Sequence, residues 1–245
     1  MKIIQSISNS PIFNLAAEEF LFSEREDDLL FLYVNESSVI IGCNQAVRNE
    51  VDLEFCAQNE IRVVRRMSGG GTVFHDEGNL NYCFISNRKA YKPVLGSDFL
   101  LPIVEVLSAL GIPVNIGKRK DLWLTGKYKI SGTASHIGKM RELHHGTLLY
   151  DTNLDVLEKT LSSESPNSVI KAIASVRSTV MNLRTWFEEE GHLTLNATDF
   201  FDFFSQKLRK HFQLESYLTL TDFEKEKIWE LAKKKYMSYE WTYKK

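Results

Sequence analysis

The chain has 245 residues, 43% of them hydrophobic, which suits one globular α/β domain with a core of its own. Its 30 basic and 32 acidic residues give a formal net charge of −2, so the basic excess of a protein that wraps nucleic acid is absent. No apolar run reaches the length of a membrane span, and the N-terminus lacks the apolar stretch of a signal peptide. We therefore expect a cytoplasmic protein that binds neither nucleic acid nor membrane, with a single domain over 1–245.

The first half of the chain predicts one helix and a series of short strands. Ser10 followed by Pro11 is typical of a helix start, and apolar residues then recur at helical spacing. Two apolar runs at 29–34 and 38–42, joined by a polar turn, predict a β-hairpin. Further strands are expected at 61–65, 72–75 and 81–86.

The second half predicts more strands and then helices. A helix is expected at 98–110, ended by Gly111, and Thr221 with Glu224 forms a capping-box pattern ahead of another. The region after Asp151 is expected to be mainly helical. Strands are expected at 121–124, 128–134 and 142–150. This order favours an α+β (mixed α/β) fold, in which helices flank a largely antiparallel central sheet.

The three cysteines are an odd number and form no CxxC pair, so neither a disulfide framework nor a zinc knuckle is indicated. We expect Cys43, Cys56 and Cys83 to be ordinary and mostly buried thiols.

Three adjacent glycines at 69–71 lie within RRMSGGGTVFHD, between two expected strands. Consecutive glycines cost backbone entropy and add no packing, which favours a role in ligand binding. Their N–H groups can cradle an anion, and Arg65 or Arg66 can supply a planar charged fork. The alternative is a flexible hairpin turn with two solvated arginines. The sequence fits neither GxxxxGK[ST] nor GxGxxG, which disfavours a standard phosphate loop or dinucleotide fold.

Strand alternation across KYKISGTA at 127–134 predicts that Lys129, Ser131 and Thr133 share a face. An inward lysine is costly to bury unless an anion meets it. Two unit charges about 4 Å apart at an effective dielectric constant near 20 attract by roughly 4 kcal/mol, which offsets part of that cost. The alternative is an exposed lysine on an edge strand.

Two adjacent histidines, His144 and His145, lie on another expected strand, so their side chains should point to opposite faces and form no joint metal site. His145 and Thr147 should share a face. An imidazole there can reach a ligand or orient a catalytic group, and a hydrogen-bonded structural role is the alternative.

Together and in this order, these stretches resemble the lipoate-protein ligase A family. The similarity is carried by RRMSGGGTVFHDEGNLNYCF at 65–84, KYKISGTA at 127–134, HHGTLLY at 144–150 and SVRSTVMNL at 175–183, supported by NLAAEE at 14–19 and IIGCNQ at 40–45. It extends to Tyr239-Glu240-Trp241 and so covers essentially the whole chain. The resemblance implies the fold of biotin ligases and class II aminoacyl-tRNA synthetases.

The resemblance also implies an enzyme, a lipoate-protein ligase that works in two steps. ATP and lipoate, with Mg²⁺, first give lipoyl-AMP and pyrophosphate, and a lysine of an acceptor domain then attacks the mixed anhydride. The implied partners are the apo lipoyl domains of 2-oxoacid dehydrogenase complexes and the glycine cleavage H protein. Lys129 is the implied catalytic residue, because its ammonium would bridge the lipoyl carbonyl and the α-phosphate.

A site for ATP and the lipoyl adenylate follows from the same resemblance. Arg66 and the stretch 71–74 are expected to contact the nucleotide, and the other matching residues to form the wall of the site. The implied residues are Arg66, Ser68, Gly69, Gly70, Gly71, Thr72, Val73, Phe74, His75, Asn79, Asp121, His145 and Thr147. No metal ligand is assigned.

The chain departs from the family pattern at three places. Family members often have Arg-Asn-Asp where this chain has Arg119-Lys120-Asp121, and an arginine where it has Cys43. Many members carry a small C-terminal domain beyond the region of Trp241, which we expect to be absent here. Either a separate accessory-domain protein replaces that domain, or the chain works efficiently only in the transfer step.

Three alternatives stay open. An octanoyl or lipoyl transferase that needs no ATP would use a cysteine near the lysine strand or downstream of it, whereas every cysteine here lies at or before Cys83. A non-catalytic protein that binds lipoyl carriers is the second, and Lys129 with the intact glycine run counts against it. The third alternative is biotin as the substrate in place of lipoate, and it is the weaker candidate. The sequence does not distinguish lipoate from octanoate as the natural acid.

Overall fold

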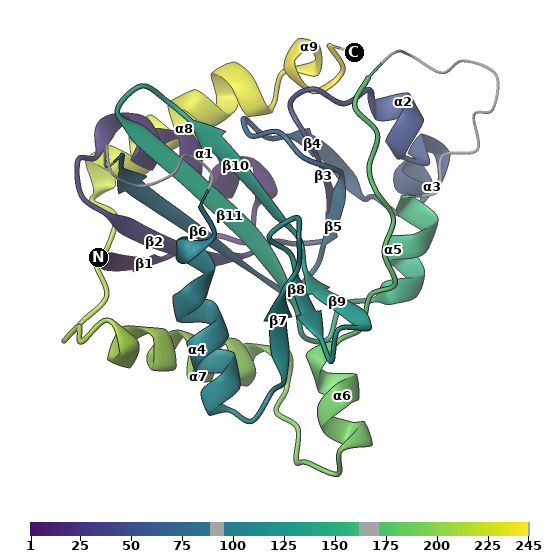
Figure 1. Ribbon diagram of the computed structural model, residues 1–245. Helices are drawn as coiled ribbons and strands as arrows, with labels where there is room; N and C mark the ends of the chain where they lie inside the picture. Colours follow the sequence, from purple (N-terminus) through teal and green to yellow (C-terminus); the bar gives the residue numbers. More distant parts are fainter. Residues whose placement is uncertain (89–95, 162–171, 245) are drawn as a thin grey trace.

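A five-stranded sheet in the order β1-β2-β6-β11-β10 forms the centre of the molecule (Figure 1). The computed structural model describes residues 1–88, 96–161 and 172–244. Within this sheet β1 and β2 are parallel and the other neighbours are antiparallel, so the predicted α+β class with a largely antiparallel central sheet is confirmed. Its strands are β1 (Lys2–Gln5), β2 (Leu29–Val34), β6 (Asn79–Asn87), β11 (Arg141–Leu149) and β10 (Thr133–Ile137).

Two three-stranded sheets lie beside the central one, in the orders β4-β3-β5 and β7-β8-β9. The predicted hairpin of 29–34 and 38–42 is wrong, because β2 pairs with β1 and β6 whereas β3 pairs with β4 and β5. Alternation identifies a strand and its faces but not its partner. The strands of the small sheets are β3 (Ser38–Ile41), β4 (Arg62–Arg65), β5 (Val73–His75), β7 (Val114–Ile116), β8 (Leu122–Leu124) and β9 (Tyr128–Ser131).

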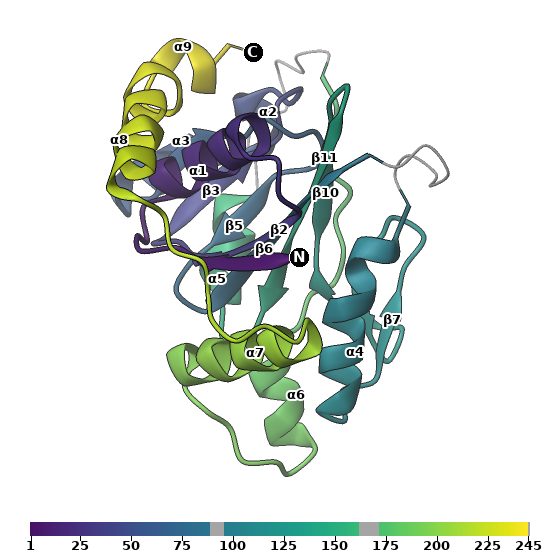
Figure 2. The ribbon, with the colours of Figure 1, turned by 90° about the vertical axis from the view of Figure 1, so that its left-hand side faces the viewer.

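Helices cover both faces of the central sheet (Figure 2). Because successive strand residues point to opposite faces, Phe31 packs in the core beneath α1 and α8, and Leu30 packs in the core beneath α4 and α7. None of the helices in the described ranges has the length and apolar character needed to span a bilayer. The helices are α1 (Pro11–Glu24), α2 (Val47–Glu50), α3 (Leu53–Gln58), η1 (Asp98–Leu100), α4 (Leu101–Ala109), α5 (Leu154–Thr160), α6 (Leu183–Glu189), α7 (Ala197–His211), α8 (Asp222–Leu231), η2 (Ala232–Tyr236) and α9 (Tyr239–Thr242).

Helix ends follow the local signals of the sequence. Ser10 caps α1 by accepting the N–H of Phe13, and Thr221 with Glu224 forms the predicted capping box of α8. The helix expected at 98–110 is a short 3₁₀ turn followed by α4, and Gly111 comes next with a φ of +81°. The region after Asp151 is largely helical where it is described, and its part at 162–171 lies outside the described residues.

The strand expected at 128–134 is in fact two strands that meet at Gly132. β9 belongs to a small sheet and β10 to the central sheet, so the chain crosses between sheets at this glycine. The alternation predicted for this stretch therefore does not continue to Thr133, whose hydroxyl donates to the Lys120 carbonyl at 2.8 Å. The crossing brings Lys129 close to the central sheet. Gly132 directly precedes β10, and a Cβ built on this glycine would lie 3.6 Å from Nζ of Lys129.

Gly146 supports a testable prediction about the central sheet. It pairs with Tyr82 across β11 and β6, and a Cβ at position 146 would collide with the Tyr82 ring and hydroxyl, which is hydrogen-bonded to Ser131 at 2.8 Å. We expect Gly146→Ala to lower the free energy of unfolding by about 1–3 kcal/mol, as overpacking in a dense core does. Urea denaturation measures the loss.

Gly69→Ala is the matched control, since a Cβ there meets no atom within 4 Å. We expect it to change the unfolding free energy by less than about 0.5 kcal/mol. A loss in Gly146→Ala as small as that expected for this control would show that β11 and β6 accommodate the extra methyl group.

Candidate functional site

A cavity of about 340 Å³ lies between the central sheet and the glycine loop, which we define as residues 68–72. A second cavity of about 810 Å³ adjoins it, and Lys129 and Gly132 line both. Apolar side chains such as Leu15 and Ile40 form part of the first wall. The predicted residues that line the first cavity are Arg66, Gly70, Gly71, Thr72, Val73, His75, Asp121, Lys129, His145 and Thr147. Phe74 lines the second, whereas Ser68, Gly69 and Asn79 line neither.

The glycine loop is held in shape by Arg66. The Arg66 guanidinium donates to the Gly69 carbonyl at 2.5 Å, to the Gly71 carbonyl at 2.7 Å and to the Ile40 carbonyl at 3.0 Å. Gly70 has a φ of +83°, which only glycine adopts without strain. Burial lowers the pKa of Arg66 to about 10. The alternative of a flexible turn with solvated arginines is therefore wrong.

Arg65 has a different environment from its neighbour. Its side chain is fully buried and contacts backbone carbonyls at Gly42, Gln45, Trp241 and Thr242 instead of the cavity. Arg66, and not Arg65, thus supplies the charged fork that was expected from one of the two arginines, and its guanidinium contacts the glycine loop. The sequence does not distinguish the two, because adjacent strand residues point opposite ways and either face can be the ligand side.

Lys129 points inward, so the alternative of an exposed edge-strand lysine is wrong. Its Nζ lies 3.6 Å from Asp121 Oδ2, and Nη2 of Arg119 lies 3.6 Å from the same oxygen. Burial lowers the pKa of Lys129, the negative charge of Asp121 acts in the opposite direction, and the positive charge of Arg119 lowers it further. Asp121 Oδ2 is itself buried and accepts no hydrogen bond from the described residues. Lys129 can therefore bind an incoming anion, and the Asp121 oxygen can bind the counter-ion of that anion.

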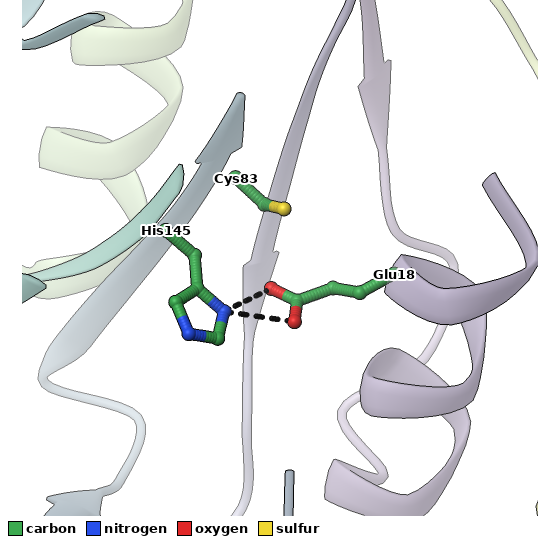
Figure 3. A group of neighbouring side chains, drawn as sticks. All are labelled: Glu18, Cys83 and His145. Atoms are coloured by element: carbon green, nitrogen blue, oxygen red, sulfur yellow. Dashed lines mark hydrogen bonds and ion pairs between the residues drawn. The ribbon is translucent and has the colours of Figure 1, made fainter. Parts of the chain in front are cut away.

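A buried hydrogen-bonded network connects helix α1 to the glycine loop, and Figure 3 shows its part between Glu18 of α1 and His145. Nδ1 of His145 donates to the Glu18 carboxylate, 2.8 and 2.9 Å from its two oxygens, and the Tyr33 hydroxyl donates to Glu18 Oε1 at 2.9 Å. On the other side of the ring, Nε2 lies 2.7 Å from Ser68 Oγ, which accepts from Nε of Arg66 at 2.9 Å. His145 and Ser68 therefore support the wall of the cavity. Reasoning from the sequence missed Glu18, although a carboxylate among the apolar residues of 14–21 was the available signal.

Cys83 lies beside Glu18 and His145, and all three residues are of types that can bind a metal ion. The ligand atoms of Glu18, Cys83 and His145 lie within 4.8 Å of one another. However, Glu18 and His145 are hydrogen-bonded to each other, which occupies the atoms that would bind a metal ion. Burial also raises the pKa of the Cys83 thiol well above its usual value, which disfavours the thiolate form that binds metals. The arrangement fits a hydrogen-bonded network better than a metal site.

The three cysteines are free, with Cys56 and Cys83 buried and Cys43 half-buried. None of them lines either cavity in the described part of the chain. Their burial agrees with the expectation of ordinary thiols, and it gives no support to a thioester route.

His75 is a neutral donor in the cavity wall. Nδ1 accepts from the Asn35 amide at 2.9 Å, and burial lowers the pKa of His75 to about 3. Nε2 therefore carries the proton, and it has no hydrogen-bond partner among the described residues. His144, on the opposite face of β11 as predicted, stacks on Phe99 at 4.4 Å and takes no part in the cavity.

The segment 173–180 closes the other side of both cavities. Ser175 Oγ accepts the Thr72 N–H at 2.9 Å and the Gln45 amide N–H at 3.0 Å, which fastens this segment to the glycine loop. The Lys129 N–H donates to the Thr179 carbonyl at 2.9 Å. The loop, the lysine strand and this segment are thus joined around one space.

Comparison with known proteins identifies the group to which this site belongs. Residues 10–209 match the family model of the lipoyl protein ligase A/B catalytic domain. The chain is 34% identical over 242 residues to lipoate-protein ligase LplJ of Bacillus subtilis, covering 96% of this chain and 71% of that protein. It is 40% identical over 186 residues to the mitochondrial lipoyl amidotransferase LIPT1 of Homo sapiens, covering 74% of this chain and 49% of that protein.

Solved structures share the fold over the whole chain. A crystal structure of lipoate-protein ligase A bound with ATP has a TM-score of 0.79 at 26% identity, covering 99% of this chain and 98% of that one. The Thermoplasma acidophilum bipartite lipoate protein ligase, studied with its E2 lipoyl domain, has a TM-score of 0.78 at 25% identity, covering 99% and 95%. The chain therefore belongs to the lipoyl protein ligase A/B catalytic domain family and is an enzyme of the lipoate-protein ligase group.

Proposed function

We propose that this enzyme activates lipoate with ATP and transfers the lipoyl group to a lysine of a lipoyl domain. The observation that carries the proposal is the inward Lys129 ammonium, which lines two adjoining cavities and is only partly neutralised by Asp121. A half-buried cation at such a junction suits a reaction that brings two anions together. The relatives named above, among them a lipoate-protein ligase and an ATP-bound ligase structure, support lipoate and ATP as those reactants.

In the first step, a carboxylate oxygen of lipoate attacks the α-phosphorus of ATP. A bond forms between that oxygen and phosphorus, and the bond from phosphorus to the pyrophosphate oxygen breaks. We assign the lipoyl chain to the 340 Å³ cavity with its apolar wall, and the nucleotide to the adjoining 810 Å³ cavity. Lys129 then lies where the two negative groups meet and stabilises the charge that develops there.

In the second step, the amine of the acceptor lysine attacks the lipoyl carbonyl. The new amide bond forms, AMP leaves with the bridging oxygen, and the amine loses a proton. The same ammonium group of Lys129 can stabilise the oxyanion and the departing phosphate. The glycine loop keeps its shape through Arg66, which holds the carbonyls of Gly69 and Gly71.

The residues present fit a single Mg²⁺ held mainly by the substrate. The buried Oδ2 of Asp121, which accepts no hydrogen bond from the described residues, supplies one hard oxygen ligand, and Mg²⁺ commonly takes its remaining ligands from phosphates and water. Lys120, where relatives often have asparagine, adds no oxygen. Bound there, the ion would neutralise charge on the pyrophosphate.

We further propose that the acceptor is an E2-type lipoyl domain, as the Thermoplasma acidophilum system suggests, with the glycine cleavage H protein as a second acceptor. A separate accessory protein that assists activation remains part of this proposal. The human relative favours one alternative, since it is named an amidotransferase and is 40% identical to this chain over the matched region. In that alternative the chain transfers a lipoyl group from a preformed adenylate.

Mass spectrometry of a purified apo lipoyl domain tests the proposal. We expect one lipoyl adduct after incubation with the protein, lipoate, ATP and Mg²⁺, and none when ATP is omitted. Lys129→Ala should lower the rate by about 10²–10³-fold, the usual cost of removing one charge-stabilising group. Lys127→Ala is the matched control, because Lys127 is an exposed lysine two residues away and should leave the rate within about twofold.

A parallel reaction supplied with synthetic lipoyl-AMP separates the alternatives. Transfer from lipoyl-AMP without activation of free lipoate would favour the transferase or a missing accessory protein. If a known ligase modifies the same acceptor and this chain modifies it under neither condition, the proposed activity is wrong.

The pH dependence of adenylate formation tests the environment of Lys129. The ammonium is lost as pH rises through its pKa, which burial holds below the ordinary value of 10.5. Asp121→Asn removes an opposite charge, so the alkaline limb of kcat should shift to lower pH. Arg119→Gln removes a like charge, so the limb should shift to higher pH. Shifts in the same direction would show that another group controls this limb.

A further inference from the structure

Arg65 is a fully buried arginine outside both cavities. Its Nε donates to the carbonyls of Trp241 at 3.0 Å and Thr242 at 2.9 Å, and its Nη1 donates to the carbonyls of Gly42 at 2.8 Å and Gln45 at 2.7 Å. Nη2 has no hydrogen-bond partner among the described residues, and burial lowers the pKa of the group. Four carbonyls from two distant segments therefore stabilise one buried charge.

Stability alone does not explain this residue, because well-packed apolar side chains often replace buried charges without loss. A guanidinium differs from them in the geometry that it imposes. Its planar fork fixes the directions of several acceptors at once. Arg65 consequently sets the position of the turn 42–45 relative to helix α9.

The turn 42–45 is packed directly on the glycine loop. The Cys43 N–H donates to the Ser68 carbonyl at 2.9 Å, and the Gln45 side chain accepts from the Thr72 hydroxyl at 2.9 Å. The Gly42 backbone lies so close to the Gly70 carbonyl that a Cβ at position 42 would collide with it. A shift of this turn must move the loop, because the contact leaves no free space.

Helix α9 is attached to the same arginine by a second bond. The Trp241 indole N–H donates to the Arg65 carbonyl at 2.8 Å, so the side chain and the main chain of Arg65 both contact this helix. The helix lies near the C-terminal end of the described chain, beside β4 (Figure 1). Tyr239 on the same helix is exposed and stacks on Tyr243.

We infer that Arg65 is a positioning residue that couples helix α9 to the glycine loop, so that the position of α9 sets the position of Thr72, the loop residue that lines the nucleotide cavity, and with it the affinity for nucleotide. The identity of the ligand rests on the proposed function, whereas the mechanical coupling does not. Because coupling between two sites is reciprocal, nucleotide bound at the loop also stabilises the observed position of α9.

Steady-state kinetics of Trp241→Phe test the coupling. This change keeps an aromatic ring at the position, although a smaller one, and removes the indole N–H that donates to the Arg65 carbonyl. We expect KM for ATP to rise by about fivefold to tenfold, the effect of one hydrogen bond, with kcat within about twofold. Arg65→Lys should show a larger rise in KM, because a lysine keeps the charge but cannot orient both carbonyl pairs. Tyr239→Ala, which changes α9 away from Arg65, should leave both constants near those of the wild type.

Hydrogen exchange gives a readout that does not depend on activity. In Trp241→Phe we expect faster exchange at the amides of Gly42, Cys43 and Thr72 as well as within α9. Faster exchange confined to 239–244 would overturn the inference even if the variant were active. If wild-type protein shows neither ligation nor transfer, the proposed function fails, and the exchange experiment still tests the coupling. Melting temperatures identify a variant that is simply unfolded.

Discussion

The burial of positive charge around one short loop is the constraint on which the rest of the structure depends. A buried ion without compensation costs several kcal/mol, and here three cationic side chains surround residues 68–72. Each is stabilised differently. Arg65 is solvated by four carbonyls, Arg66 by the carbonyls of the loop itself, and Lys129 by a carboxylate 3.6 Å away. Carbonyls neutralise no net charge, so the loop retains an attraction for anions that a fully paired set of ions would lack.

The local order of residues predicted much of this architecture. Alternation predicted the opposite directions of His144 and His145, because these depend only on strand geometry, whereas it left open whether Lys129 points inward or to solvent. The glycine run predicted a loop that approaches a ligand closely, and in the structure residues 70–72 line the first cavity.

What the sequence did not predict depends on contacts between distant segments. Strands β2 and β3 were predicted to pair with each other because they are neighbours in the chain. In the structure β2 pairs with β6 in the central sheet, and β3 pairs with β4 in a small sheet. The residue pattern by itself left Arg65 and Arg66 as alternatives for the charged fork, and the distant carbonyls that Arg65 contacts distinguish the two. Glu18 was passed over because its partner His145 lies 127 residues away.

The crossing of the chain at Gly132 has a consequence for how the site is assembled. Lys129 belongs to the β7-β8-β9 sheet, and the glycine loop connects β4 and β5 of the β4-β3-β5 sheet. The ammonium and the loop thus belong to separate small sheets, which segment 173–180 joins through Ser175 and Thr179. Local opening of either layer would separate the two halves while the larger core remains intact. Heat should therefore inactivate this enzyme below the temperature at which its central sheet melts.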